Sequence, residues 1–212
     1  MMKMSFGLFD GMVVQRNGSG VSCQSFAGSC TGSGDLVASA VCRKGGKSVK
    51  GLKSVKIGSA SGNKFKGVLK GLPTGGPYDI KLEIVSGKKA VESLTVRNVL
   101  VGDVWMLGGQ SNMQGCGNAC HALKPNPLVR AFYMDNKWEN AKDPIHNLYE
   151  AAARVHADLM GPNAKAPAVN YKGTGPGVAF AQEMYRKTSV PQGLIASGHG
   201  GTSMTQWDPS LK

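Results

Sequence analysis

The first 97 residues alternate short runs of β-prone side chains with clusters of glycine, serine and asparagine. Residues 78–84 show the pattern most clearly, because apolar and polar side chains alternate there, as in a strand with one face in water. Turn signals such as Asn17-Gly18 and the segment 73–77 separate the runs at intervals too short for intervening helices. We therefore expect residues 1–97 to form a small antiparallel β-sandwich.

The pattern changes after Asn98. Residues 104–107 form a continuous apolar run that leads into two glycines, and this predicts a central strand buried on both faces. Apolar runs at 131–134 and 193–196 predict two more strands of the same sheet. Between these two runs, residues 177–188 predict a helix with one apolar stripe, formed by Val178, Ala181 and Tyr185. Strands that alternate with helices indicate a parallel sheet, so residues 98–212 are expected to form an α/β domain.

Positive charge is concentrated in the first region. The chain has 25 lysines and arginines against 13 acidic residues, a net charge of +12. Of these, 15 basic and 5 acidic residues precede Asn98, which favours two regions with different surfaces. Five lysines recur every three residues from Lys44 to Lys56, a period that matches neither a strand face nor a helix face. We expect solvated lysines that discourage edge pairing; no aromatic residue lies among them to stack on nucleic acid, and no nucleic-acid partner is expected.

Amino-acid composition excludes only a few further classes of protein. None of the five cysteines stands in a Cys-x-x-Cys pair, so no metal centre is expected. Cys23, Cys30 and Cys42 could form one disulfide, but unpaired thiols fit at least as well. No apolar stretch of signal-peptide length follows the start, and no run reaches the roughly 18 apolar residues of a membrane span. The chain as written is expected to be soluble, without a membrane partner, and its oligomeric state is open.

The strongest local signal for chemistry is Gly109-Gln110-Ser111-Asn112-Met113, directly after the apolar run 104–107. We expect Ser111 where a strand turns sharply into a helix, with glycines that permit the turn and the close approach of a substrate. Unpaired N–H groups at the start of such a helix stabilise the oxyanion that forms when a serine attacks an ester. From spacing alone, a serine that merely caps a helix fits the same pattern.

Two motifs extend this signal into a family resemblance. Gly102-Asp103-Val104-Trp105, followed by the segment 109–113, resembles the nucleophile segment of the sialate O-acetylesterases, carbohydrate acetylesterases of the SGNH hydrolase superfamily. A second match follows in the expected order, at residues 190–195 with Gly200-Gly201-Thr202 and Trp207. Weaker matches extend the likeness over nearly the whole chain, at residues 8–16 and 175–181. The resemblance implies a truncated SGNH-type, flavodoxin-like parallel-sheet domain after the β-sandwich.

The resemblance also implies a Ser-His-Asp esterase that needs no metal or organic cofactor. Ser111 maps onto the nucleophile. The pocket for the oxyanion and the substrate would be formed by Gln110, Asn112, Gly200, Gly201 and Thr202. For the two glycines, a tight loop without a catalytic part fits the sequence as well. Trp207 is expected in the core rather than as a platform for a sugar.

The chain departs from the family where the triad should be completed. The family carries its catalytic Asp and His in an Asp-x-x-His segment near its C-terminus, and an amide of the oxyanion hole in an earlier Gly-Glu-Ser-Asn segment. Neither segment follows Trp207 here. The segment from Asp143 to His146 matches the Asp-x-x-His pattern. It precedes the segment 175–181, however, whereas the family's Asp-x-x-His lies near the C-terminus, so His146 with Asp143 is the less favoured candidate for the base. We expect the base to lie outside these residues, and the chain by itself to be a poor esterase.

Other side chains of interest have structural explanations. Three further histidines have weaker cases for a role: His121, His156 and His199. His199 could donate a hydrogen bond to a substrate, although a surface loop histidine is the favoured interpretation. A helix after Ser111 would place Cys116 and Cys120 four residues apart, where packing is favoured over a redox pair.

These observations favour a serine esterase that removes O-acetyl groups from sugars, with an acetylated carbohydrate as its partner. An acetylxylan or other polysaccharide acetylesterase fits the same motifs, and a non-catalytic carbohydrate-binding remnant would keep the same elements. Nucleic-acid binding through the lysines lacks a recognisable motif. The resemblance implies an extracellular or periplasmic location for the complete protein, and the sequence leaves the sugar and the acetyl position open.

Overall fold

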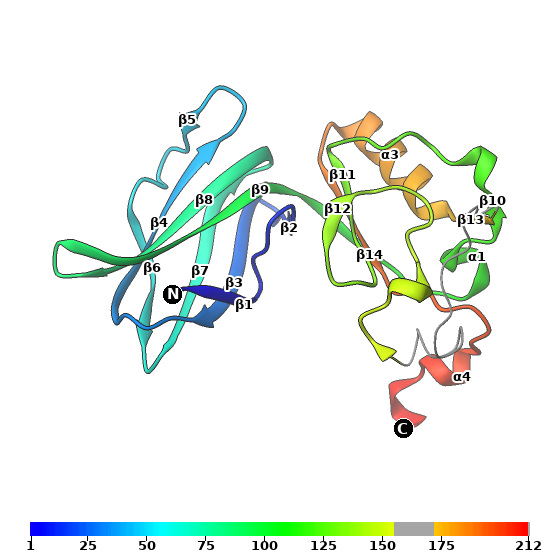
Figure 1. The fold of residues 1–212 in the computed structure, drawn as a ribbon. Coiled ribbons are helices and arrows are strands. Elements are labelled where there is room, and N and C mark those ends of the chain that lie inside the picture. The colour runs from blue at the N-terminus through cyan, green and yellow to red at the C-terminus, as the bar shows by residue number, and fades with distance from the viewer. Residues whose placement is uncertain (155–171, 212) are drawn as a thin grey trace. The chain divides into compact units, whose positions relative to one another are not determined.

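The computed structural model describes residues 1–154 and 172–211, which form two compact units (Figure 1). The first unit is Met1–Asp103 and the second is Val104–Lys212. Within the described residues, the first unit contains strands and no helix, whereas the second contains both. The chain as a whole is therefore of mixed α/β character.

The N-terminal unit is built from β-strands joined by tight turns. Its strands are β1 (Lys3–Phe6), β2 (Val13–Gln15), β3 (Val21–Ser29), β4 (Gly34–Cys42), β5 (Lys47–Ser48), β6 (Val55–Ser61), β7 (Lys64–Pro73), β8 (Gly75–Ser86) and β9 (Lys89–Leu107). Hydrogen bonds link them in the order β1-β3-β7-β6-β4-β8-β9, with β5 added to β4. Every pair along this path is antiparallel, as predicted, whereas β2 pairs with residues 100–102 of β9 in parallel.

Strands along the whole hydrogen-bonded path contribute to one core in this unit. Phe26 on β3 and Phe65 on β7 are each 2% exposed, and their ring centroids are 6.4 Å apart. Leu82 on β8 and Val99 on β9, from the other end of the hydrogen-bonded path, belong to the same buried cluster. Hydrogen bonds connect these strands in a single sheet, so the two separate sheets of the predicted β-sandwich are not confirmed.

Val99 provides a test of this core. Its side chain is fully buried, whereas Val91 on the same strand is 47% exposed. Removal of two buried methyl groups costs about 0.8 kcal/mol each plus a cavity contribution, so Val99→Ala is expected to lower the free energy of unfolding by about 2 kcal/mol. Val91→Ala should change it by less than about 0.5 kcal/mol. Urea denaturation of both variants measures the difference, and equal losses would contradict the assigned core.

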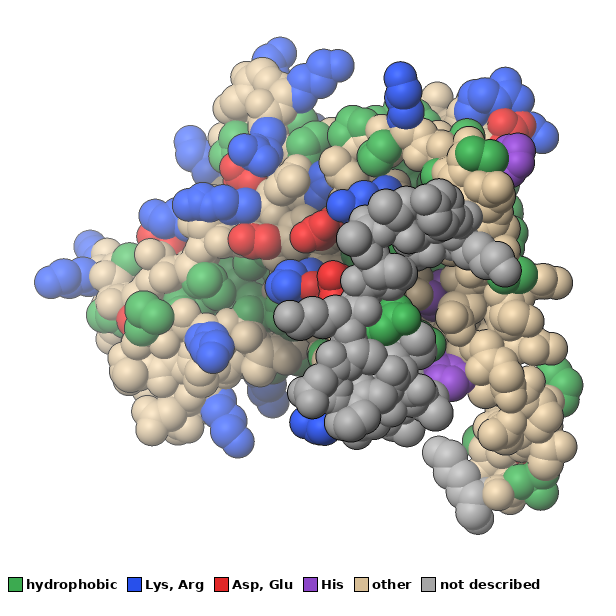
Figure 2. Space-filling model, turned by 45° about the vertical axis from the view of Figure 1, so that its right-hand side comes forward, with side chains coloured by type: hydrophobic (Ala, Val, Ile, Leu, Met, Phe, Trp, Pro, Cys, Tyr) green, Lys and Arg blue, Asp and Glu red, His purple; other side chains and the backbone are tan. Residues whose placement is uncertain are grey.

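The lysines that recur from Lys44 to Lys56 are exposed, as predicted. They fall on turns, on β5 and on β6, so no single strand face collects them. Lys56 forms an ion pair of 2.7 Å with Asp35 across the β4–β6 ladder. On the face that Figure 2 shows, many lysine and arginine side chains stand apart from one another. This distribution agrees with a solvated surface.

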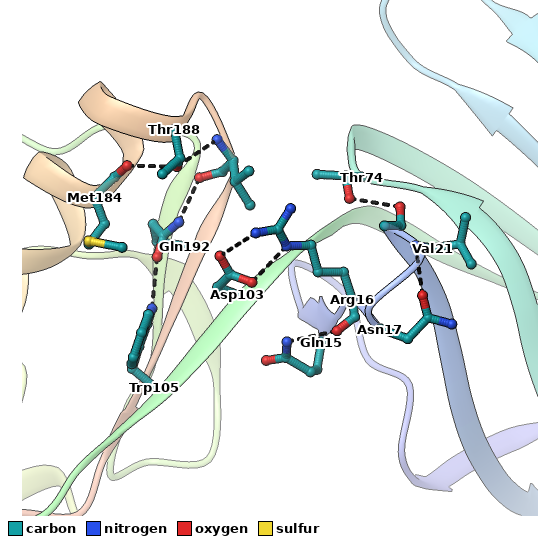
Figure 3. Close-up of polar contacts among 12 residues, drawn as sticks. Gln15, Arg16, Asn17, Val21, Thr74, Asp103, Trp105, Met184, Thr188 and Gln192 are labelled. Carbon is teal, nitrogen blue, oxygen red and sulfur yellow. Dashed lines mark hydrogen bonds and ion pairs between the residues drawn. The ribbon is translucent and has the colours of Figure 1, made fainter.

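Strand β9 runs through the boundary between the units without a break. The change in charge pattern predicted a boundary near Arg97, but the units divide after Asp103, inside β9. The reason is that residues 99–102 still pair with β8 and β2 of the first unit. Arg16 holds the Asp103 carboxylate with two hydrogen bonds, of 2.8 and 3.0 Å, and so extends this attachment by one residue (Figure 3).

The second unit contains a small mixed sheet with helices and loops around it. After the end of β9, its elements are α1 (Ser111–Gln114), β10 (Gly117–Asn118), η1 (Ala119–His121), β11 (Val129–Phe132), β12 (Trp138–Asn140), η2 (Leu148–Glu150), β13 (Lys172–Thr174), α3 (Pro176–Thr188), β14 (Gln192–Ala196), α4 (Met204–Trp207) and η4 (Pro209–Leu211). The sheet order is β9-β14-β11-β12, in which β11 and β14 are parallel and β12 is antiparallel to β11. Strands β10 and β13 form a separate antiparallel ladder. The predicted strands at 131–134 and 193–196 correspond to β11 and β14.

Helix α3 packs on this sheet with the predicted stripe. Val178 and Ala181 are fully buried, and Tyr185 packs against the same cluster. The cluster also contains Leu194 of β14. Proline at the first helical position favours the start of the helix, and Ser189, with a φ of 55°, ends it in the left-handed conformation.

The end of β9 is not the central, doubly buried strand that the apolar run 104–107 predicted. Leu107 is buried, but Trp105 is 36% exposed and Met106 is 71% exposed. Among the described residues of this unit, β14 is the only strand next to this part of β9, so the run lies at an edge of the sheet that these residues form. An apolar run predicts burial correctly only when both faces and both neighbours of the strand are covered, and here they are not.

All five cysteines lie in the described part of the chain as free thiols; Cys30 is buried, and Cys23, Cys116 and Cys120 are exposed. Over residues 1–154 and 172–211, no helix has both the length and the apolar character needed to cross a membrane. The same residues contain no group of three or more His, Cys, Asp or Glu side chains placed to hold a metal ion.

Candidate active site

Ser111 stands at the turn from β9 into α1, as predicted. Strand β9 ends at Leu107, residues 108–110 link it to the helix, and Ser111 is the first residue of α1. Gly109 has a φ of 146°, which few other residues adopt, and a Cβ there would lie 3.0 Å from the Met113 side chain. The turn therefore requires glycine at this position, and it leaves Ser111 exposed.

Helix α1 is a single turn, but it is anchored. The N–H groups of Gln114 and Gly115 donate to the carbonyl oxygens of Gln110 and Ser111, over 2.9 and 3.0 Å. Met113 packs against the buried cluster of the second unit. The backbone on either side of the serine is thus fixed by hydrogen bonds and by one apolar contact.

The helix after the serine is shorter than the sequence predicts. It stops before Gly115, whose φ is 109° and where a Cβ would meet the Gly173 carbonyl oxygen at 2.3 Å. Cys116, Cys120 and His121 lie beyond the helix and are exposed. The prediction that the two cysteines pack on a helix is therefore wrong, because the close approach of the β13 backbone forces the chain out of the helical conformation at the glycine.

The Ser111 hydroxyl is held by its neighbour. Its Oγ donates to Gln110 Oε1 over 3.3 Å, a long hydrogen bond. Asn112 is also exposed, and its Oδ1 accepts a hydrogen bond from the Cys116 thiol at 3.3 Å. Within residues 1–154 and 172–211, no histidine is hydrogen-bonded to Ser111. The hydroxyl is therefore exposed, and no base among the described residues is hydrogen-bonded to it.

The loop after β14 is attached to the end of β9 at two points. The hydroxyl of Ser197 donates to the Leu107 carbonyl oxygen over 2.9 Å. The N–H of His199 donates to the Gly109 carbonyl oxygen over 2.8 Å. From the first contact to the second, both segments advance by two residues, so the loop runs parallel to the turn that carries the serine.

Gly200 lies directly beside the serine. A Cβ on Gly200 would stand 3.8 Å from the Cα of Ser111, so two residues that the sequence assigned to one pocket are neighbours. The Gly200 N–H donates to Gln114 Oε1 over 2.5 Å. Because this N–H is already engaged, the geometry favours a part for Gly200 in shaping the pocket over a part in donating to an oxyanion.

Gly201 and Thr202 continue this loop. Gly201 is exposed, with a φ of 77°. The Thr202 hydroxyl donates to the His199 carbonyl oxygen over 2.7 Å and accepts from the indole N–H of Trp207 at 2.8 Å. Trp207 is 40% exposed, so its predicted place in the core is wrong. The reason is that its helix, α4, is one turn long and buries none of its residues.

His146 is buried, and backbone groups occupy both of its ring nitrogens. Nδ1 lies 3.2 Å from the Gln114 carbonyl oxygen, and Nε2 lies 2.9 Å from the N–H of Gly198. A carbonyl oxygen only accepts and an N–H only donates, so these partners select the neutral ring with its proton on Nδ1. The Nε2 lone pair already accepts from Gly198, which leaves no lone pair for the proton of Ser111.

Asp143 does not orient the His146 ring. Its Oδ1 accepts from the N–H of Gly175, just before α3, over 3.3 Å, and burial raises the pKa of this carboxyl group. The Asp and the His of this Asp-x-x-His pattern therefore bind different backbone segments. The less favoured catalytic pair is not assembled in this structure. His156 lies outside the described residues.

Acidification tests the neutral state of His146. Burial lowers its pKa from the usual 6.5, so the unfolded chain binds a proton at a pH where the folded ring resists it. This group is therefore expected to reduce the free energy of unfolding as the pH falls below about 6.5, by up to about 1.4 kcal/mol per pH unit. Asp143 has the opposite effect on the free energy of unfolding, because its pKa is raised and the folded chain therefore takes up its proton more readily than the unfolded chain. This effect falls at pH values nearer to the usual aspartate pKa of 3.8.

Urea denaturation of the wild-type chain and of His146→Gln, between about pH 5 and 8, isolates this contribution. The difference between the two curves cancels the titration of the groups that both proteins share. The wild type should lose stability more steeply on the acidic side. Equal slopes in both proteins would contradict the assignment of a neutral, buried ring.

A hollow of about 220 Å³ opens elsewhere on the second unit. It is lined by Tyr133, Met134, Asp135, Glu139, Lys142, Pro144, Asn147 and Glu150. The Tyr133 hydroxyl lies 3.0 and 3.1 Å from the carbonyl oxygens of Asn140 and Lys142, and burial raises the pKa of Tyr133 to about 12. This phenol stays protonated and supports the loop, and none of the predicted site residues lines the hollow.

The second unit matches a known family. Residues 101–212 fit the family model described as carbohydrate esterase, sialic acid-specific acetylesterase. The sialate O-acetylesterase of Homo sapiens is 29% identical over 164 residues, and that of Pongo abelii is 28% identical over the same length. Each match covers 74% of this chain, and the chain spans 30% of the length of these curated relatives. An X-ray structure of an Arabidopsis thaliana protein is 25% identical and covers 50% of this chain and 44% of its own, with a TM-score of 0.35.

Proposed function

This chain belongs to the sialic acid-specific acetylesterases, a family of carbohydrate esterases, and from this premise we propose that it removes O-acetyl groups from sugars with Ser111 as its nucleophile. Membership of the family makes ester hydrolysis the expected class of reaction. The chain spans 30% of the length of its curated relatives. The complete activity, the sugar and the extracellular or periplasmic location therefore belong to the proposal.

The position of Ser111 carries the assignment. Its hydroxyl is exposed at a strand-to-helix turn, with the Gly200 backbone beside it. The N–H of Ser111 stands at the first position of α1, where it has no acceptor within the helix. A carbonyl carbon that reaches the hydroxyl would therefore bring its oxygen towards a backbone donor.

In the proposed reaction, Ser111 Oγ attacks the carbonyl carbon of the acetyl group while a base takes the hydroxyl proton. The carbonyl oxygen becomes an oxyanion that N–H groups stabilise. When the bond to the sugar oxygen breaks, that oxygen takes the proton and leaves an acetyl-serine. Water, deprotonated by the same base, then attacks this ester and releases acetate, which restores the serine. These steps require no metal or organic cofactor.

The side chains around Ser111 have separate parts in this proposal. Gln110 Oε1 orients the hydroxyl before a substrate arrives. The amide of Asn112 is exposed next to the nucleophile and can donate to the substrate or the oxyanion. Gly201 and Thr202 border the pocket, where the absence of a Cβ at the glycine leaves space for a sugar.

The base is not assigned to a described histidine. His146 uses both ring nitrogens on backbone groups and is 5% exposed. The family resemblance instead points to an Asp-x-x-His segment that follows the matched region. We propose that this segment supplies the histidine that takes the proton of Ser111.

A carbohydrate-binding remnant without catalysis is the second candidate. The observation in its favour is that the described hydrogen bond of the Ser111 hydroxyl goes to Gln110 and not to a base. An acetylxylan or other polysaccharide acetylesterase is a variant of the first candidate, because the same residues would attack a different ester.

Measurement of acetate release separates these candidates. The purified protein and its Ser111→Ala variant are incubated with O-acetylated sialic acid and with acetylated xylan. Faster Ser111-dependent release from the sialic acid supports the sialate esterase, and faster release from xylan replaces it with the polysaccharide esterase. Binding of either sugar without Ser111-dependent release over background would support the remnant.

A further inference from the structure

Three backbone segments of the second unit meet around residues 143–146. They are the end of α1, the loop after β14 and the residue before α3. The Asp143 carboxylate holds the last of these, through the N–H of Gly175. His146 connects the other two, and both of them border Ser111.

The His146 ring bridges segments that are far apart in the chain. Its two backbone partners, Gln114 and Gly198, are 32 and 52 residues away in sequence. The ring is 5% exposed, so both hydrogen bonds form largely out of water, where an unpaired polar atom is costly. A side chain that satisfies a carbonyl on one segment and an N–H on the other resists separation of the two.

The space around Gly198 is tight. A Cβ there would lie 3.1 Å from both His146 Nε2 and the Gln114 backbone nitrogen. The glycine is buried and sits directly between the ring and the end of α1. The His146 ring and the backbone of α1 therefore determine where the loop can run.

A second bridge continues from the first. The carbonyl oxygen of Gln114 contacts the His146 ring, and its side-chain oxygen accepts the N–H of Gly200 at 2.5 Å. The ring thus fixes the residue that in turn holds Gly200 beside Ser111. Gly198 and Gly200 are held on both sides of His199 by these two contacts.

We propose that His146 is a positioning residue of the Ser111 site: its neutral ring, with the proton on Nδ1, ties the end of α1 to the loop 198–200 and so sets the wall of the pocket next to the nucleophile. This inference rests on the proposed function in so far as Ser111 is the reacting group. His146 touches neither the serine nor a substrate, so its effect on the reaction passes through Gln114 and Gly198.

Protonation distinguishes this role from that of a general base. A base must accept a proton at its free nitrogen during the reaction. If His146 Nε2 took a proton, its N–H would face the N–H of Gly198 and the bridge would break. A positioning ring therefore works only while it stays neutral, and an amide that makes one of the same two hydrogen bonds should replace it in part.

Two conservative variants test the two hydrogen bonds separately. His146→Asn keeps an N–H near the position of Nδ1, and His146→Gln places an amide oxygen near the position of Nε2. His146→Ala removes both. Amide hydrogen exchange at Gly198 and Gly200, with Leu194 of β14 as the internal control, measures how firmly the loop is held.

We expect exchange at Gly198 to accelerate at least about tenfold in His146→Ala, with a smaller change in His146→Gln and with Leu194 unchanged. Imidazole nitrogen chemical shifts of the wild-type chain should identify the Nδ1–H form. Unchanged Gly198 exchange in a folded His146→Ala or His146→Asn variant, both of which lose the acceptor of the Gly198 N–H, would overturn the proposal, as would a ring protonated on Nε2. If His146→Ala does not fold, the comparison of Asn and Gln variants decides it.

The rate of Ser111-dependent hydrolysis of p-nitrophenyl acetate supplies the functional readout. A positioning role predicts that His146→Asn and His146→Gln keep at least about tenfold more of this rate than His146→Ala, because each retains one bridge. A catalytic base predicts that all three fall together, since none accepts a proton near neutral pH. That result would overturn the proposal. A wild-type chain without Ser111-dependent hydrolysis would count against the proposed function alone, while exchange and the ring tautomer still decide the role of His146.

Discussion

Replacement of Ser111 with alanine is expected to abolish covalent labelling by an alkyl fluorophosphonate and to remove the small Ser111-dependent part of acetyl ester hydrolysis by this chain. In a longer chain that also carries the base, the same replacement should lower the rate on the order of 10³-fold or more. The probe forms a bond to the serine oxygen, and alanine has no oxygen to form it. The fold should be unaffected, because Ser111 is exposed and its side chain makes one long hydrogen bond, to Gln110.

The control for this experiment is Ser86→Ala, which removes an exposed hydroxyl from β8 in the other unit. Its labelling and hydrolysis should equal those of the wild type. Mass spectrometry of the labelled peptide locates the adduct. Labelling that persists in Ser111→Ala, or an adduct on another serine, would remove the basis of the proposed function.

The parts of the fold that the sequence predicted correctly are those with a strong local pattern. Helix α3 carries Val178, Ala181 and Tyr185 at helical spacing, and all three face the core. Strand β8 alternates apolar and polar residues, and the apolar set is buried. The turn before Ser111 was predictable because glycines follow an apolar run, and Gly109 does take a conformation that favours glycine.

Features that depend on distant partners were not predictable in the same way. The exposure of Trp105 and Met106 depends on which strands flank β9, and an apolar run does not encode this. The short antiparallel strand β12 follows a turn in which Asn136 has a φ of 64°, and its three residues, 138–140, carry too little pattern to predict a strand. The early end of α1 depends on the approach of Gly173, from a segment far along the chain.

In the candidate site, too, some features were predictable from the sequence and others were not. The proximity of Gly200 to Ser111 was expected from the resemblance, because both motifs belong to one family pattern. The structural role of His146 was not expected. The reason is that the Asp-x-x-His pattern fits a catalytic pair and a structural bridge equally well. Only the positions of Gln114 and Gly198 show that the ring is already occupied. A sequence motif gives residue types in order, whereas hydrogen-bond partners follow from the folded backbone.

The 212-residue chain is expected to hydrolyse p-nitrophenyl acetate on the order of 10³-fold more slowly than an extended chain that also carries the family's Asp-x-x-His segment. The chain spans 30% of the length of those relatives, and among the described residues the Ser111 hydroxyl is hydrogen-bonded to Gln110 and not to a base. A serine hydroxyl is a weak nucleophile near neutral pH, and without an imidazole within about 3 Å its attack loses most of its driving force. Binding and backbone N–H groups still contribute, so a small Ser111-dependent rate should remain in the short chain.

The decisive comparison sets the short chain, the extended chain and the Ser111→Ala variant of each on the same substrate. Subtraction of the Ser111→Ala rate from each parent removes hydrolysis that does not use the serine. In the extended chain, alanine in place of the histidine of an Asp-x-x-His segment should return the rate to that of the short chain, because the same proton acceptor is then missing from both. If the short chain instead matches the extended one and Ser111→Ala abolishes both rates, the base lies within these 212 residues. His146 would then have to leave Gln114 and Gly198 to reach the serine, or another histidine of the chain would have to supply the imidazole, and the proposed division of roles would be wrong.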